Sequence, residues 1–266
     1  MDVNKKTFLS YLELLRKFLL RCSIGVVLSS CISFLYIEFI FDHIIFAAKS
    51  SDFPTYTWYN SLTKFLNLSS LSSMDGSAFE IQNRKIDGQL IIMIFTSITF
   101  GFIISFPWIL YQIWEIVKTR IDKNTVKYSI LFVTVTSALF FTGVLFGFYI
   151  ILPLSIHFFM NIEISSIVTN QIDLTSYISL VRTTILASGI VFVLPVVILV
   201  LHKMGIFSRE TLKGYRKYAY VAMLVVSAII TPPDILSQVI LVIPLVILYE
   251  SSIFLSKFIS PRFITK

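Results

Sequence analysis

The residues with the clearest chemical character lie in one apolar stretch near the end of the chain. Residues 231–250 read T-P-P-D-I-L-S-Q-V-I-L-V-I-P-L-V-I-L-Y-E. Pro232 and Pro233 stop a helix that ends near Thr231, because proline has no N–H to continue the helical hydrogen bonds and moves the preceding residue out of the helical region. The sequence therefore predicts a structural turn between two apolar helices.

Three polar side chains in this stretch could bind a ligand. Asp234 and Gln238 follow the turn, and Glu250 ends the stretch. A carboxylate in hydrocarbon is costly, so each acid either reaches headgroups or performs a function. Asp234 and Gln238 could cap the next helix, where a carboxylate favours the helix dipole, or could act in transport. Glu250 could reach water or pair with Lys257, or it could accept a basic peptide.

The sequence offers no residues for catalysis. It contains no H-E-x-x-H motif, no glycine-rich phosphate loop and no nucleophile beside a base. Cys22 and Cys31 lie nine residues apart on one expected helix, too far apart for a disulfide. His43, His157 and His202 fall at or near the ends of apolar segments, and we interpret them as solvated interfacial residues. We predict neither an enzyme nor a metal site nor a cofactor.

Composition identifies the environment in which these residues must work. The 266 residues are 56% hydrophobic and only 14% charged, and the mean hydropathy is +0.84. Soluble proteins carry roughly a quarter charged residues, so the chain is predicted to be an integral membrane protein. The net charge of +7 comes from short basic clusters between apolar runs, a distribution that indicates membrane topology rather than nucleic-acid binding.

The apolar runs predict an all-α polytopic membrane protein with six transmembrane helices. The expected spans are residues 22–42, 89–114, 128–152, 177–202, 218–230 and 235–249. About 20 apolar residues cross a hydrocarbon core of about 30 Å, so the last two spans are short and imply local thinning of the bilayer. Residues 1–21 form an amphipathic helix at the interface, and residues 43–88 form a folded external cap.

The distribution of basic residues predicts the orientation. Four segments on one side of the membrane hold seventeen of the twenty-two Lys and Arg residues: 1–21, 115–127, 203–217 and the tail after Tyr249. Because cytoplasmic loops are enriched in Lys and Arg, both termini are predicted to be cytoplasmic.

Several motifs in order along the whole chain resemble one family. They are L-x-x-L-R-K at 12–17, F-P-W-I-L-Y-Q-I-W at 106–114, F-x-x-G-V-L-F-G-F-Y-I-I-L-P-L at 140–154, and T-P-P-D-x-x-S-Q at 231–238 followed by I-P-L-V-I-L-Y-E. Each motif is modest, but the set resembles TatC, the multi-spanning subunit of the twin-arginine protein translocase, in its Bacteroidetes-type form.

The resemblance implies a fold, a location and a function. A TatC protein is expected to form a concave bundle of six helices in the cell inner membrane. It is expected to be the receptor and core subunit of the translocase, which binds the twin-arginine signal peptides of folded proteins. It is also expected to recruit single-span TatA/TatB-type proteins into an oligomeric complex. The resemblance implies neither a cofactor nor nucleic acid.

The resemblance also assigns binding residues in this chain. The residues expected to bind the signal peptide or the partners are Glu13, Arg16, Asp122, Asp234, Gln238 and Glu250. An acidic site suits the ligand, because arginine stays charged and binds carboxylates through two parallel hydrogen bonds. Three positions at which the family carries an acid hold Leu14, Thr125 and Val193 here. The acidic site is therefore expected to be weakened.

Three alternatives stay open from the sequence. Glu13 and Asp122, with Glu115, could replace the missing acids; one residue turns a helical side chain by about 100°, so Glu13 would need a rotated or frayed helix. The protein could instead recognise few substrates in a relaxed way, or be decaying. The last alternative is a small-solute transporter or channel, which would ordinarily carry an internal repeat or paired broken helices at mid-membrane. The sequence has neither feature.

Overall fold

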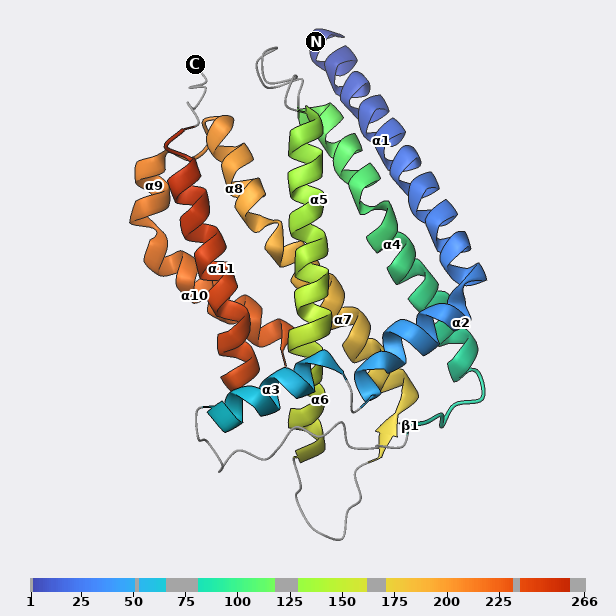
Figure 1. Cartoon of the computed structure of the whole chain (residues 1–266). Coiled ribbons are helices and arrows are strands. Elements are labelled where there is room, and N and C mark those ends of the chain that lie inside the picture. The colour runs from blue at the N-terminus through green and yellow to red at the C-terminus, as the bar shows by residue number, and fades with distance from the viewer. Residues whose placement is uncertain are drawn as a thin grey trace. The chain divides into compact units, whose positions relative to one another are not determined.

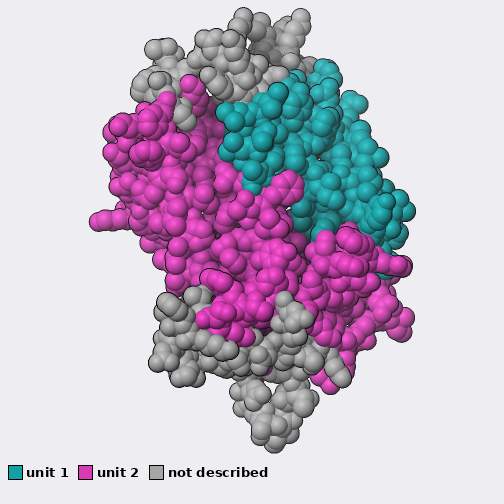
Figure 2. All heavy atoms as spheres, in the orientation of Figure 1, with its two compact units in different colours: residues 1–37, 93–138 teal, residues 38–92, 139–266 magenta. Residues whose placement is uncertain are grey.

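Helices make up nearly all of the structure in the computed structural model of the chain (Figure 1). The residues described are 2–50, 53–65, 81–117, 129–161, 171–231 and 235–258. They belong to two compact units, coloured separately in Figure 2. Unit 1 comprises residues 1–37 and 93–138, and unit 2 comprises residues 38–92 and 139–266. The predicted helical membrane class is confirmed.

Unit 1 is built from α1 (Asp2–Leu35), most of α4 (Gly88–Val117) and the first part of α5 (Ser129–Phe146). A glycine brings α1 and α4 together, since a Cβ added to Gly101 would lie 2.6 Å from the Cα of Ser30. Small residues at such crossings let two helix backbones approach closely. The van der Waals packing that results helps to hold helices together in a bilayer.

Aromatic rings also contribute to the packing of unit 1. The indole N–H of Trp108 donates to the carbonyl oxygen of Arg21 at 3.2 Å, and a Cβ on Gly25 would lie 2.6 Å from the same ring. Trp114 stacks on Phe132 of α5 with ring centroids 4.2 Å apart. The tryptophans of the F-P-W-I-L-Y-Q-I-W motif therefore hold helices together.

Unit 2 contains the remaining elements, and its apolar core lies between the later helices. The helices in chain order are α2 (Ile37–Ile40), η1 (Phe41–Ile45), η2 (Phe46–Lys49), α3 (Pro54–Phe65), the end of α5, η5 (Gly147–Ile151), α6 (Leu152–Asn161), α7 (Leu174–Phe192), α8 (Leu194–Lys203), α9 (Arg209–Gly214), α10 (Arg216–Ile230) and α11 (Ile235–Leu255). The core includes the buried residues Ile151, Phe192, Leu241, Leu245 and Ile253.

The third predicted span continues further than the sequence suggested. Residues 153–176 were expected to form a loop, but α6 continues the helix through Pro153 to Asn161. Pro153 has no N–H for the carbonyl of Tyr149 four residues earlier. The wide π-helical turn η5 precedes it, and the Tyr149 carbonyl accepts a hydrogen bond from Oγ1 of Thr55 instead. A side chain of α3 thus replaces the missing backbone donor, where α3 crosses the junction of η5 and α6 (Figure 1).

Part of the expected external cap is folded. Besides α3, it contains the strand β1 (Ile81–Gln82), which pairs in parallel with β2 (Ile172–Asp173). Tyr56 of α3 is buried and its hydroxyl donates to the carbonyl oxygen of Ala48 at 2.8 Å. The two short strands are the one departure from an all-helical fold in the described residues.

Within the described residues, five helical segments are long and apolar enough to cross a membrane. They are Leu12–Leu35, Gly88–Ile116, Ile130–Met160, Leu174–Lys203 and Ser237–Leu255. The span expected over 22–42 is displaced towards the N-terminus, because α1 is one continuous helix and no separate interfacial helix precedes it. The predicted span 218–230 forms α10, whose 15 residues reach only about 22 Å. It therefore falls short of a typical hydrocarbon core of about 30 Å.

Candidate functional site

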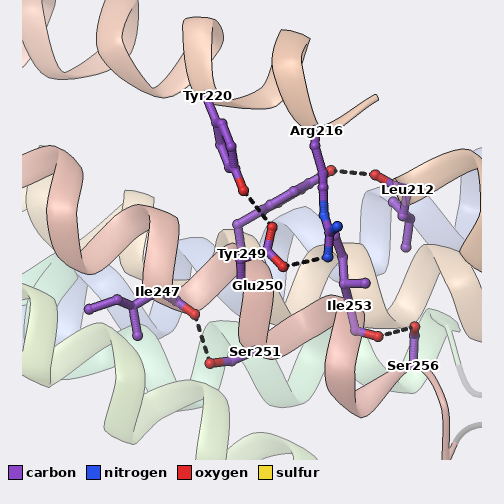
Figure 3. Close-up of polar contacts among 9 residues, drawn as sticks. All are labelled: Leu212, Arg216, Tyr220, Ile247, Tyr249, Glu250, Ser251, Ile253 and Ser256. Atoms are coloured by element: carbon purple, nitrogen blue, oxygen red, sulfur yellow. Dashed lines mark hydrogen bonds and ion pairs between the residues drawn. The ribbon is translucent and has the colours of Figure 1, made fainter. Parts of the chain in front are cut away.

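A polar cluster joins the ends of α10 and α11 (Figure 3). Glu250 of α11 accepts a hydrogen bond from Nη2 of Arg216 at 2.7 Å and another from the hydroxyl of Tyr220 at 2.5 Å. The Arg216 and Glu250 side chains are 41% and 35% exposed. Next to them, the hydroxyl of Tyr249 donates to the carbonyl oxygen of Leu212 at 2.9 Å. Of the alternatives left open for Glu250, a pairing with Lys257 is not the one observed: the carboxylate pairs with Arg216.

The helical hairpin explains why these residues meet. Arg216 and Tyr220 are four residues apart, so they share one face of α10. Arg216 lies 16 residues before Pro232 and Glu250 lies 17 residues after Pro233, so an antiparallel pair of helices brings them level. Sequence reasoning missed Arg216 and Tyr220, although this symmetry about the T-P-P-D turn could have identified them.

Gln238 lies near the other end of the same hairpin. Its side-chain Nε2 donates to the carbonyl oxygen of Leu224 at 3.2 Å. Its backbone carbonyl oxygen accepts a hydrogen bond from Oγ of Ser227 at 2.9 Å. The capping role considered for Gln238 is therefore replaced by a bridge to α10. Asp234, Pro232 and Pro233 lie outside the described residues.

The remaining predicted residues fall on α1 or outside the described residues. Glu13 and Arg16 are exposed on α1, and Leu14 between them is 54% exposed. Asp122 and Thr125 are not among the described residues. Val193 is buried at the junction of α7 and α8, where Pro195 forces the helix to restart. The structure therefore joins only Glu250 and Gln238 to other polar groups by described contacts.

One histidine differs from its predicted role. His202, expected to be solvated at a span end, is 2% exposed, and its Nδ1 lies 2.8 Å from the carbonyl oxygen of Phe207. A histidine at a helix end can satisfy the backbone of the turn that follows, and here it fixes the chain between α8 and α9. The described residues contain no cluster of three or more His, Cys, Asp or Glu that could hold a metal ion.

Each unit also has hollows with apolar walls. In unit 1, α1 and α4 border hollows of about 610 Å³ and about 400 Å³, the first lined by Val26, Phe34 and Ile98. In unit 2, a smaller cavity of about 180 Å³ lies among α7, α8, α10 and α11.

Comparison with known proteins assigns the chain to a family. Residues 10–244 match the family described as Sec-independent protein translocase protein (TatC). The chain belongs to the TatC family. The TatC of Blattabacterium sp. subsp. Periplaneta americana is 38% identical over 98% of both chains, and that of Helicobacter pylori is 35% identical over 70% of this chain and 76% of the relative.

A solved structure agrees with this assignment. A crystal structure of the twin arginine translocase receptor TatC in DDM has a TM-score of 0.72 and 31% identity, and covers 92% of this chain and 98% of that one. TatC is a component of the Sec-independent protein translocase, so this chain is a membrane transport protein rather than an enzyme. The resemblance to TatC found in the sequence is confirmed at the level of the family, and the small-solute alternative loses its basis.

Proposed function

We propose that this TatC protein is the receptor and core subunit of a twin-arginine translocase, binding the signal peptides of folded proteins and recruiting single-span TatA/TatB-type partners into an oligomeric complex. The observation that carries the proposal is the similarity, over 92% of the chain, to the crystal structure of the twin arginine translocase receptor TatC. The predicted concave bundle of helices belongs to this proposal.

We also propose six crossings, with both termini in the cytoplasm and the protein in the cell inner membrane. The five long spans leave α10 as the sixth, and its short length would require a thinned bilayer or polar ends. The Lys and Arg distribution supports the orientation, because an even number of crossings places all the basic segments on one side.

The signal-peptide site is proposed at the start of α1. Glu13 and Arg16 are exposed there, beside the exposed Leu14 that replaces the family acid. In this proposal Glu13, together with Asp122 and Glu115, accepts the guanidinium groups of the twin arginines. The apolar part of the signal would lie in the hollows along α1 and α4, whose walls are mostly apolar.

The residues of the α10–α11 hairpin are proposed to contact the partners and to stabilise the fold. Gln238 lies near the turn end of α10 and α11, where a single-span helix could reach it. Asp234, which is outside the described residues, is proposed to act with it. Glu250 already accepts two hydrogen bonds within the hairpin, so we assign it to positioning the hairpin rather than to direct contact with the signal peptide.

Charge reversal tests the signal-peptide site. We expect Glu13→Lys combined with Asp122→Lys to abolish photocrosslinking of a twin-arginine signal peptide, because cations would face the guanidinium groups. Glu210→Lys, an exposed acid on α9, is the matched control and should leave crosslinking intact. Unchanged crosslinking in the double variant would sink the proposed site, while complementation of a TatC-deleted bacterium tests the function itself.

A second candidate, relaxed signal recognition, is favoured by one observation. Where the family carries acids, this chain has the exposed apolar side chain of Leu14 and the buried one of Val193. A site with fewer carboxylates discriminates arginine from lysine less strongly, because lysine cannot form the two-pronged contact. Export of a substrate whose signal carries two lysines in place of the arginines would favour relaxed recognition, and loss of export would exclude it.

A further inference from the structure

The outward side of α10 carries an apolar row of side chains that begins at a cation. Lys217, Val221, Val225 and Ile229 follow one another every four residues, so they lie one above the other along the helix. All four are exposed, and the three apolar side chains are 60%, 54% and 77% exposed in chain order. We call these four residues the outward row.

The other cations near the start of α10 are already engaged with acids. Arg216 turns towards α11, where its guanidinium pairs with Glu250 (Figure 3). Glu210 offsets the charge of Lys213. Hydrogen bonds from its own backbone N–H and from a serine hydroxyl, and then nearby cations that include Lys213, lower the pKa of the Glu210 carboxyl. Among the described residues Lys217 forms no ion pair, so its charge is available to an anion from outside.

Two exposed tyrosines flank Lys217. Tyr215 is 59% exposed and Tyr218 is 71% exposed, and their ring centroids lie 5.7 Å apart. Tyrosines gather at the headgroup level of a bilayer, where Lys and Arg attract anionic lipids. From Lys217 to Ile229 the helix rises about 18 Å, close to the roughly 15 Å of hydrocarbon in one leaflet. The outward row therefore has the order of a phospholipid, with a charged end followed by hydrocarbon.

We propose that the outward row binds an anionic phospholipid of the cytoplasmic leaflet, with its phosphate at Lys217 and one acyl chain along Val221 and Val225. The inference rests on the proposed crossing of α10. A lipid fits the row better than a partner helix does, because none of its members is one of the small residues that let membrane helices approach closely. An inorganic phosphate would use Lys217 alone and leave the apolar part of the row uncovered.

Photolabelling of α10 in vesicles tests the site. The full-length protein is reconstituted with equimolar phosphatidylglycerol and phosphatidylcholine, one or the other carrying a diazirine on its acyl chain, and mass spectrometry of the peptides locates the crosslinks. We expect phosphatidylglycerol to label the outward row on the order of fivefold more than phosphatidylcholine, the contribution of one surface cation. In Lys217→Gln the two lipids should label the row equally.

Two other lysines provide controls. Lys213→Gln should keep most of the preference for phosphatidylglycerol, because Glu210 already offsets that cation. Lys85→Gln, at an exposed lysine outside α9 and α10, should leave the preference unchanged.

The outcomes separate the lipid site from the proposed topology and function. Equal labelling by both lipids in the unaltered protein, or an unchanged preference in Lys217→Gln, would overturn the lipid site and leave the crossing of α10 intact. Labelling of neither Val225 nor Ile229 by either lipid would overturn the crossing as well. A photocrosslinking amino acid in place of Val225 that captures a protein in intact cells would overturn the site in favour of a partner helix. Complementation of a TatC-deleted bacterium scores the receptor function separately.

Discussion

At the scale of single residues, the Glu250 carboxylate accepts hydrogen bonds from Arg216 and Tyr220 across the α10–α11 hairpin. We expect Arg216→Glu to lower the free energy of unfolding by about 1 kcal/mol or more, since a partly exposed pair is replaced by a repulsion. The exchange Arg216→Glu/Glu250→Arg should restore most of the lost free energy of unfolding. Thermal unfolding in detergent measures both changes.

Lys257→Gln is the control for this pair, and it should leave unfolding unchanged because Glu250 is held by Arg216. An exchange variant no more stable than the single variant would contradict the pairing. If Glu250 also contacts a ligand directly, the exchange will restore stability without restoring export.

A second prediction for a single residue concerns Thr55. Its hydroxyl donates a hydrogen bond to the Tyr149 carbonyl, for which Pro153, four residues later, has no backbone N–H. We expect Thr55→Val to cost about 1 kcal/mol in unfolding free energy, the net contribution of a part-buried hydrogen bond. Thr57→Val should cost much less, because the Thr57 hydroxyl makes only an exposed local bond to Pro54.

A double-mutant cycle makes this prediction specific. In a Pro153→Ala background the residue at 153 regains an N–H for the Tyr149 carbonyl, so Thr55→Val should cost clearly less there than in the native chain. Equal costs in both backgrounds would show that Thr55 stabilises α3 in some other way.

At the scale of elements, the crossing of α1 and α4 depends on Gly101. We expect Gly101→Ala to destabilise the protein by about 1–3 kcal/mol, because the new Cβ would press on the backbone of Ser30 as well as on its hydroxyl, and the backbone cannot rotate away. Gly214→Ala is the matched helical control, since no atom lies within 4 Å of its added Cβ. That variant should be neutral or up to about 1 kcal/mol more stable, from helix propensity alone.

Denaturation of both glycine variants in the same detergent provides the comparison. A Gly101→Ala protein as stable as the native chain would mean that α1 can move away from α4 at little cost. In that case the close approach would not determine the packing of unit 1.

At the scale of the whole molecule, the number of crossings decides where each loop lies. In a variant without Cys22 and Cys31, we expect a cysteine at Lys213 to resist a membrane-impermeant thiol reagent in intact cells and a cysteine at Asn83 to react. This result follows from the orientation that places the basic loops inside. If α10 does not cross, cysteines placed before and after it will react alike, and the termini will face opposite sides.

The sequence by itself determined the membrane class, the family and most of the long helices. Hydrophobicity and charge are sums over neighbouring residues, so a run such as 89–114 can be recognised without knowing what it packs against. Motif order is also a property of the chain alone. The errors came where local rules compete: the third span was expected to end at residue 152, but the helix continues through Pro153, where η5 and Thr55 compensate for the missing N–H.

Only the tertiary structure decided which polar groups meet. Glu250 and Arg216 are 34 residues apart, and Thr55 and Tyr149 are 94 residues apart, so no local pattern contains either contact. His202 shows the same limit, because its burial depends on helices packed around it rather than on its place at a span end. Burial and pairing belong to two distant segments at once, and the fold alone brings those segments together.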